Sequence, residues 1–350
     1  RETLIKSSAS QTHPLELALR MRCGMQMKQM TLAAAADASA GFERFRKPTR
    51  RDAFLAEMQT LVPWDRLVAL IEPHYPKPGN GRPPIGLERM LRIHLLQHWF
   101  NLADAACEEA LYDSAALRAF AGIDLGREPV PDATTILKFR HLLERHHLGQ
   151  ALFAEVGRIL QERGLRLSAG TIVDATIIAA PSSTKNAQQQ RDPEMRQTRK
   201  GKQWHFGMKV HVGADSKTGL VHSAVVTSAN VHDKHPLPDL LHGSERRVYG
   251  DRGYQGCTDI IKAAAPQARD FTNRRVRKPG GEDEAERLRN RTKSRTRARV
   301  EHPFHVLKRL WGFAKVRYRG LAKNANRAFT ALAMVNLYMA ARRVPALVRP

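Results

Sequence analysis

The spacing of apolar residues changes near the middle of the chain, and this change limits the possible folds more than any other feature. In the first half, apolar residues such as Leu87, Leu91 and Leu95 recur at the helical interval. In the second half, short β-branched runs and strict alternation take over, which is typical of strands. The sequence therefore predicts an all-helical region over residues 27–165, followed by an α/β region over residues 166–345.

The helical region contains several helices separated by turn-forming residues. The helix that carries Leu87 follows a stretch rich in proline and glycine. A second helix is expected over residues 104–120, and after a loop at 122–131 either Asp132 or Thr134 should cap a third. This arrangement fits a helix-turn-helix that reads DNA or a plain helical bundle, and helical spacing does not separate the two.

The α/β region alternates strands with helices in an order that predicts a mixed sheet with helices on its faces. Its first strand, over residues 171–178, is rich in β-branched residues, and residues 203–212 alternate strictly between apolar and polar side chains. The remaining expectations are a loop over 180–202, a return strand over 220–227, helices over 238–242, 258–265 and 284–311, and a strand over 247–250.

The charge balance is the unusual part of the composition. The chain has 58 lysines and arginines against 34 acidic residues, which gives a net charge of +24. A surface this basic favours a polyanionic partner, and the release of counterions makes nucleic acid the natural one. The alternative is a solvated basic surface. Cys23, Cys107 and Cys257 lie far apart and form no CxxC pair, which argues against disulfides and a cysteine zinc site and indicates a reducing, cytoplasmic compartment.

The termini carry neither a membrane segment nor a recognisable secretion signal. The longest apolar stretch, over residues 331–341, is too short to span a bilayer. The sequence opens on Arg1, and Met25 or Met27 would be a plausible start. We therefore expect residues 1–26 to be an upstream extension, and we assign them no function.

Three acidic residues lie where a catalytic site would need them. Asp174 interrupts an otherwise apolar strand, and a buried carboxylate needs a partner, a metal ion or an open strand edge. Asp251 directly follows a short strand, and strand ends are the usual location of ligand sites in α/β sheets. Glu301 lies on the last long helix, where it shares one face with Arg297 and Lys308.

These carboxylates, in a basic surrounding, predict a magnesium site. Mg²⁺ prefers carboxylate oxygens, and two such ions can activate a nucleophile and stabilise the leaving oxygen of a phosphodiester. The alternative is that Asp174 is only a turn acid and that Glu301 only pairs with Arg297. The placement of both aspartates on or after strands favours the metal site.

The helix that carries Glu301 should pack on the sheet through an apolar stripe next to the acidic face. Pro303 interrupts the hydrogen-bond ladder, which predicts a restart or kink just after Glu301. The members of the stripe are Val300, Phe304, Leu307 and Trp311.

Several stretches closely resemble those of a known family. Residues 170–186, 191–195 and 203–209 resemble the first catalytic block of insertion-sequence-5 family transposases. Residues 300–304 and 317–321 resemble the third block of the same family. The resemblance extends over nearly the whole chain. It implies an RNase H-like mixed β-sheet flanked by helices and preceded by an all-α N-terminal domain.

The resemblance also implies an activity and a set of site residues. Asp174, Asp251 and Glu301 correspond to the catalytic, metal-binding acids of the family, with Mg²⁺ as cofactor and Mn²⁺ able to substitute. The implied function is that of a bacterial insertion-sequence transposase, which binds terminal inverted repeats and catalyses strand cleavage and strand transfer. The implied partners are double-stranded DNA of the element ends and the target, together with further copies of the chain in a homodimer or larger assembly. The implied location is the bacterial cytoplasm, in association with the nucleoid.

Insertion-sequence-4 relatives share a Tyr, Arg, Glu, Lys signature around the last acid. Arg297, Glu301 and Lys308 fit this signature, whereas Ser294 stands at the tyrosine position, so a phosphate contact by that tyrosine is not carried over. We carry over Arg297 and Lys308 as contacts to the DNA backbone. Basic stretches elsewhere predict further DNA-binding residues, namely Lys185, Arg199, Lys200, Lys202, Arg274 and Arg275.

Further candidates and alternatives stay open at this point. Trp204 and Tyr254 could stack on an unpaired base, although packing in the core or at an edge is the simpler expectation for both. Asp233, preceded by His232, is the substitute for Asp251 should that assignment fail. A catalytically inactive, transposase-derived DNA-binding protein is the main alternative function. A metal-dependent nuclease without strand transfer is a third.

Overall fold

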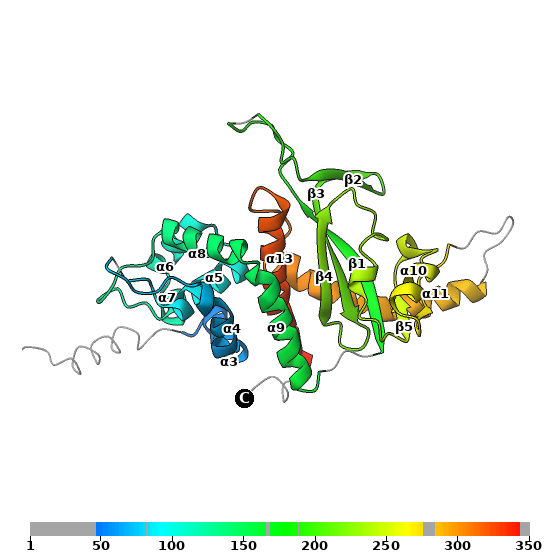
Figure 1. Cartoon of the computed structure of the whole chain (residues 1–350), viewed down its shortest axis with the longest axis horizontal. Helices are drawn as coiled ribbons and strands as arrows, with labels where there is room; N and C mark the ends of the chain where they lie inside the picture. The colour runs from blue at the N-terminus through cyan, green and yellow to red at the C-terminus, as the bar shows by residue number, and fades with distance from the viewer. Residues whose placement is uncertain (1–46, 82, 166–168, 188, 276–283, 344–350) are drawn as a thin grey trace, which may run out of the picture. The chain divides into compact units, whose positions relative to one another are not determined.

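The computed structural model describes residues 47–81, 83–165, 169–187, 189–275 and 284–343. The extension expected over residues 1–26, and the first residues of the region expected over 27–165, lie outside this part of the chain. The segment Arg51–Pro350 forms one compact unit. Helices dominate its first part and a mixed sheet with flanking helices its second, so the predicted fold class is confirmed (Figure 1).

The helical part follows the predicted pattern with one difference. The helix expected over 104–120 is broken at Ser114, whose side-chain oxygen accepts a hydrogen bond from the Leu117 amide and so begins a new helix. Asp132 caps the next helix by accepting from the Thr135 amide at 2.7 Å, as one of the two predictions required. The helices are α3 (Arg50–Leu61), α4 (Trp64–Ile71), α5 (Leu87–Trp99), α6 (Asp104–Asp113), α7 (Ala115–Ala121), α8 (Ala133–Arg145) and α9 (Leu148–Glu162), with a short 3₁₀ turn, η1 (Glu72–His74).

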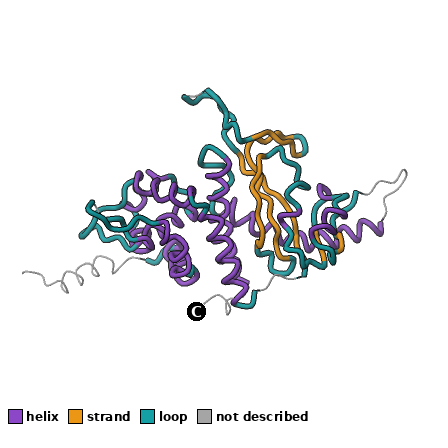
Figure 2. The backbone as a smooth tube through the Cα atoms, in the orientation of Figure 1, coloured by secondary structure: helices purple, strands orange, loops and turns teal. Residues whose placement is uncertain are grey.

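The sheet is built around its first strand, β1 (Gly170–Ala179). On one side β1 pairs antiparallel with β3 (Gln203–Asp215), which in turn pairs antiparallel with β4 (Val221–Ser228). On the other side β1 pairs parallel with β5 (Arg247–Tyr249), and β5 pairs parallel with β6 (Arg269–Asp270). Figure 2 shows these strands together as one sheet, which is the mixed topology expected.

A stretch that was predicted to be a loop contains a strand. β2 (Arg196–Lys200) lies inside the expected loop over 180–202 and pairs antiparallel with the first residues of β3. Its residues are polar and mostly exposed, so the stretch has no alternation of apolar side chains that could have marked it as a strand. Backbone pairing with β3 therefore decides its conformation.

The two faces of the sheet pack against different elements. On one face, Ile172, Val210 and Val212 belong to a core that also includes α9 and α13 (Leu321–Arg343). Those helices lie side by side, so the helical part and the sheet share one core (Figure 1). The opposite face carries Val173 and Val248, covered by η2 (Pro238–Leu240) and α10 (Thr258–Ala264). Across the described ranges, no helix combines the length and apolar character needed to cross a membrane.

The helix that carries Glu301 is interrupted before that residue, so the predicted kink just after Glu301 is in the wrong place. α11 (Glu284–Arg297) gives way to a 3₁₀ turn, η4 (Ala298–Val300), and α12 (Glu301–His305) begins at the acid. A final π-helical turn, η5 (Val306–Leu310), follows. Pro303 has no amide hydrogen, and its ring crowds the carbonyl four residues earlier, which disturbs the turn that precedes the proline.

Candidate active site

Asp174 and Asp251 lie side by side because β1 and β5 are parallel and in register. Ile172 is aligned with Tyr249, and each aspartate comes two residues later: Asp174 within β1, and Asp251 just after β5 ends. Side chains two residues apart on a strand point to the same face, so both carboxylates emerge together where the β1–β5 pairing ends. Asp251 also accepts a hydrogen bond from the Gly253 amide at 2.8 Å, which fixes its orientation.

The electrostatics of Asp174 reflect this crowding. The pKa of Asp174 is raised to about 6, chiefly because burial disfavours the charged form and also because Asp251 places a second negative charge nearby. The Ala175 amide, Arg297 and Lys200 act in the opposite direction and lower the pKa. The site thus holds two acids that repel one another and that are only partly neutralised by the chain.

The helical segment from α11 to η5 is anchored along β1 by two basic side chains. Arg297 donates from Nη1 to Oδ2 of Asp174 at 3.1 Å. Farther along, Lys308 donates from Nζ to the Thr176 hydroxyl at 3.2 Å and to the Ile177 carbonyl at 3.0 Å. The apolar stripe beneath is confirmed, since Val300, Leu307 and Trp311 are buried and Phe304 packs against the same core.

Glu301 lies between these two anchors, exposed to solvent. The simpler interpretations of these acids are wrong. Asp174 lies within a strand rather than a turn, and Arg297 pairs with Asp174. Nevertheless, the described residues contain no group of three acidic, histidine or cysteine side chains close enough to hold a metal ion. The fold therefore brings Asp174 and Asp251 together and leaves Glu301 on the neighbouring helix, outside such a group.

The two acids that lie together, Asp174 and Asp251, are suitable ligands for a divalent cation. Adjacent carboxylates offer the oxygen ligands that Mg²⁺ prefers, and a cation between them would relieve the repulsion that raises the pKa of Asp174. Asp174 and Asp251 are the residues placed to bind it, and Glu301 is the acid placed on the adjoining helix.

Asp233 occupies a different setting from Asp251. Its carboxylate accepts from Nζ of Lys209 at 2.9 Å and lies 3.7 Å from Nδ1 of the buried His211. Tyr254 is only 1% exposed, and Asp233, Asp174 and Asp251 all act with burial to raise the pKa of its hydroxyl far above the usual range. Tyr254 is thus a packed residue beneath the acids, which agrees with packing rather than base stacking.

Ser294, which stands at the tyrosine position of the signature, makes a contact within the protein. Nδ2 of Asn273 donates to the Ser294 hydroxyl at 3.0 Å, and the Asn273 amide donates to the Gly250 carbonyl beside Asp251. Ser294 therefore helps to tie α11 to the segment after β6. A contact of this kind is structural, and a single sequence could not have predicted it.

The predicted DNA-binding residues fall into separate groups. Lys200 lies near both Asp174 and Lys308, since its charge lowers the pKa of each. Arg297 and Lys308 themselves border the acids, whereas Lys185 lies on the exposed loop after β1. The remaining residues are exposed: Arg199 on β2, Lys202 at the β2–β3 turn, and Arg274 and Arg275 after β6.

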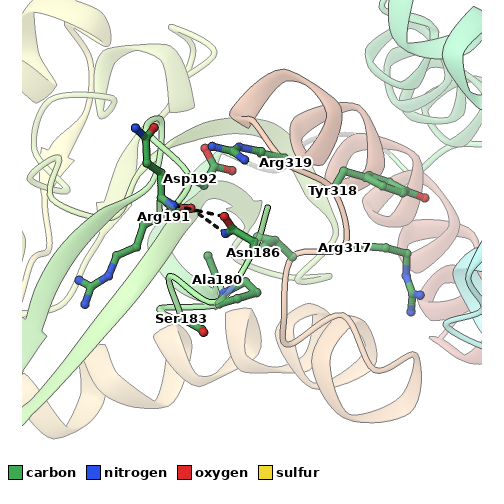
Figure 3. Close-up of a pocket in the computed structure, with 11 residues that line it drawn as sticks. Ala180, Ser183, Asn186, Arg191, Asp192, Arg317, Tyr318 and Arg319 are labelled. Atoms are coloured by element: carbon green, nitrogen blue, oxygen red, sulfur yellow. Dashed lines mark hydrogen bonds between the residues drawn. The ribbon is translucent and has the colours of Figure 1, made fainter. Parts of the chain in front are cut away.

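Two of the family-like stretches meet in space and have a structural role. Asp192 and Glu194 accept hydrogen bonds from the Gly320 and Leu321 amides at 2.7 and 2.6 Å, where α13 begins. A hollow of about 230 Å³ lies at this junction. In Figure 3, the side chain of Arg317 points away from this hollow, and it donates hydrogen bonds to Asn101 in the helical part.

A further basic cluster was not predicted from the sequence. It lines a hollow of about 480 Å³ near the start of β1, at the other end of that strand from its link to Lys308. These residues come from separate parts of the chain, so no run of charge marks them, and only Arg299 falls within a basic stretch. The basic residues of this cluster are Lys217, Arg246, Arg247 and Arg299.

Two family models match the chain, and together they identify the family. Residues 166–337 match the family described as "Transposase DDE domain", and residues 43–142 match "Transposase domain (DUF772)". Among solved structures, the chain is similar to a piggyBac transposase in a synaptic complex with hairpin DNA, with 10% sequence identity and a TM-score of 0.46. That alignment covers 87% of this chain and 78% of the other. The chain belongs to the transposases that carry a DDE domain, in the two-part arrangement typical of the insertion-sequence-5 family.

Proposed function

We propose that this transposase belongs to a bacterial insertion sequence, binds the terminal inverted repeats of its element, and catalyses Mg²⁺-dependent cleavage and joining of DNA strands. The observation that supports the proposal is the pair formed by Asp174, within β1, and Asp251, two residues after the parallel strand β5, bordered by Arg297, Lys308 and Lys200. Acids that bind a cation, next to bases that bind phosphates, are what phosphodiester chemistry requires.

The proposed metal-binding residues are Asp174, Asp251 and Glu301. When bound, Mg²⁺ or the similarly oxygen-seeking Mn²⁺ supplies activation of the attacking oxygen and charge stabilisation of the leaving oxygen. Asp174 and Asp251 provide a rigid pair of ligands, because β1 fixes the first and the hydrogen bond from the Gly253 amide fixes the second. Glu301 completes the set from the helix anchored by Arg297 and Lys308.

The basic residues are proposed to hold and orient the DNA backbone. Lys200 lies near enough to Asp174 for its charge to lower the pKa of that acid, so it could neutralise a phosphate beside the reacting one. Because Arg297 is only partly exposed, it contributes to the same field while it orients Asp174. Backbone contacts away from the acids are proposed for Lys185, Arg199, Lys202, Arg274 and Arg275, all of which are exposed.

The proposed assembly follows from the reaction. Two element ends must be brought together before joining, so we infer at least a homodimer around paired double-stranded ends and target DNA. We further infer a place of action in the bacterial cytoplasm, at the nucleoid, where such DNA lies. The exposed surface of the described residues carries many of the lysines and arginines behind the net charge of +24.

The test uses DNA taken from the sequences that flank the coding region of the element. Asp174→Asn and Glu301→Gln should each lower the rate of end cleavage with Mg²⁺ by at least about 10³-fold, because each removes a ligand charge. Both variants should still shift the mobility of end DNA to the same extent as the unchanged protein. Full cleavage activity in either variant would overturn the assignment.

A matched pair of variants decides the second acid. Asp251→Asn should abolish cleavage, whereas Asp233→Asn should retain it, because Asp233 is paired with Lys209 while Asp251 is the acid whose charge acts on Asp174. The opposite outcome would transfer the role to Asp233. Analysis of the products then separates the activities, since joined DNA indicates strand transfer and free ends alone indicate a nuclease.

A further inference from the structure

Trp204 is far more exposed than its chemistry favours. It keeps 66% of its surface accessible, more than any other large apolar side chain in the described ranges. Packing at the core or an edge, the simpler expectation for this residue, is therefore wrong. An exposed indole offers a large, rigid aromatic surface to a binding partner, which is why tryptophan is enriched at interfaces.

The β2–β3 hairpin presents Trp204 next to a guanidinium group. Arg199 lies directly across from Trp204 in the antiparallel register, so the two side chains share a face. The guanidinium carbon of Arg199 is 6.0 Å from the centre of the Trp204 ring. Phe206, two residues later on the same face, has a similar partner in Arg191 at 5.6 Å but is half-buried. Of these two aromatic side chains, only Trp204 offers an open ring face.

The same hairpin carries a dense positive charge close to the acids. Arg196, Arg199, Lys200 and Lys202 are all exposed. Lys200 lies on the opposite face of the hairpin from Trp204 and close enough to Asp174 to lower its pKa. The hairpin thus borders the candidate active site on one side and presents an aromatic platform on the other.

We propose that the β2–β3 hairpin binds an unpaired DNA base, which stacks on Trp204 while the basic residues hold the adjoining phosphates. This inference rests on the proposed transposition function and extends it to single-stranded DNA. A base inside a duplex has both faces covered by its neighbours, so an open indole selects a base that has left the stack. Aromatic platforms beside cations bind single strands with little sequence preference.

The intrinsic fluorescence of the full chain provides a direct readout. The chain has 4 tryptophans, of which Trp99 and Trp311 are buried and Trp64 is partly covered by Arg92. A 20-nucleotide oligo(dT) should quench the emission of Trp204 by stacking. A blunt 20-base-pair duplex should quench it much less. The quenching by oligo(dT) should disappear in Trp204→Phe.

Binding affinities separate stacking from charge. Trp204→Ala should weaken oligo(dT) binding by about 5- to 100-fold, measured by fluorescence anisotropy, while affinity for the blunt duplex changes less than about twofold. Trp204→Phe should retain most of the affinity. The matched control is Tyr112→Ala, which removes an exposed aromatic ring on α6 and should leave both affinities unchanged.

The outcomes distinguish this inference from the proposed function. Unchanged oligo(dT) binding in Trp204→Ala overturns the inference even if the protein cleaves element ends. An altered oligomeric state in light scattering, with unchanged DNA binding, also overturns it and indicates a contact between copies of the chain. Conversely, Asp174→Asn that still cleaves, together with a Trp204-dependent oligo(dT) complex, overturns only the assigned chemistry.

Discussion

Charged side chains have opposite surroundings in the helical part and at the pair of acids on the sheet, Asp174 and Asp251. In the helical part, Arg140 is buried and donates to Glu144 at 2.7 Å and to Asp104 at 3.1 Å. Its guanidinium also lies 3.9 Å from the ring centre of Tyr318, in the segment before α13. On the sheet, Asp174 has one arginine partner, Arg297, and the negative charge of Asp251 lies nearby.

Buried histidines show the same contrast. His94 and His98 lie with their Nε2 atoms 3.2 Å apart in the core of the helical part. Burial, together with nearby positive charge, lowers the pKa of His94 to about 3 and that of His98 well below its usual value, so both are neutral near pH 7. The carboxylate of Asp174 is instead only partly compensated by positive charge, and a bound cation or a proton would stabilise it.

The difference indicates which charged groups stabilise the fold and which are arranged for a ligand. Paired or neutralised groups in the helical part hold the connection to α13 in place. The burial of Asp174 and its repulsion with Asp251 destabilise the fold locally, as is usual at a preformed binding site. Substitutions that remove a charge in the two regions should therefore change the free energy of unfolding in opposite directions.

The largest effect is expected for Arg140→Met. The change leaves Asp104 and Glu144 without their buried partner and should lower the free energy of unfolding by about 3–5 kcal/mol in denaturant titrations. Arg158→Met is the control, because Arg158 forms similar pairs but its side chain is 57% exposed, and it should cost less than about 1 kcal/mol. Equal losses in the two variants would contradict the contrast.

The pH dependence of stability should follow from the histidine pair. Because the folded-state pKa values of both histidines are lowered, their contribution to stability is present above about pH 6.5 and is lost progressively as pH falls below that value. Each histidine should cost up to about 1.4 kcal/mol per pH unit in this window. His98→Phe should therefore reduce the slope of unfolding free energy between pH 6.5 and 5, and an unchanged slope would argue against neutral burial.

Asp174→Asn should change stability in the other direction. The folded-state pKa of Asp174 is raised from 3.8 to about 6, so its favourable contribution exists at low pH and is lost as pH rises through 6. At pH 7.5 with chelator, the neutral amide should raise the free energy of unfolding by about 1–3 kcal/mol, measured by thermal or denaturant unfolding. Asp104→Asn, which weakens the Arg140 pair, should lower stability under the same conditions.

The smallest effect compares two aspartates with the same local geometry. Asp132 and Asp251 each accept a backbone amide at the start of a helical turn, at 2.7 and 2.8 Å. Asp132→Ala should lower the free energy of unfolding by about 1 kcal/mol and leave end cleavage intact. Asp251→Ala should cost less stability, because it also removes the repulsion with Asp174, and should abolish cleavage. Loss of cleavage in Asp132→Ala would remove the distinction.

Local pattern was sufficient for much of this protein. The change in apolar spacing predicted the helical and α/β regions, and the acid within the strand over 171–178 marked Asp174. These features depend on residues close together in the chain, whose preferences act without long-range contacts. The same is true of the cap at Asp132, which needs only the next three residues.

Other features depend on which segments meet in the folded chain. The parallel register that sets Asp251 beside Asp174, the pairing that makes β2 a strand, and the Arg297–Asp174 bond all join distant residues. A single sequence contains no local signal for such contacts, because they arise from sheet register and packing. For the same reason, the exposure of Trp204 and the burial of Tyr254 could be distinguished only after the chain had folded.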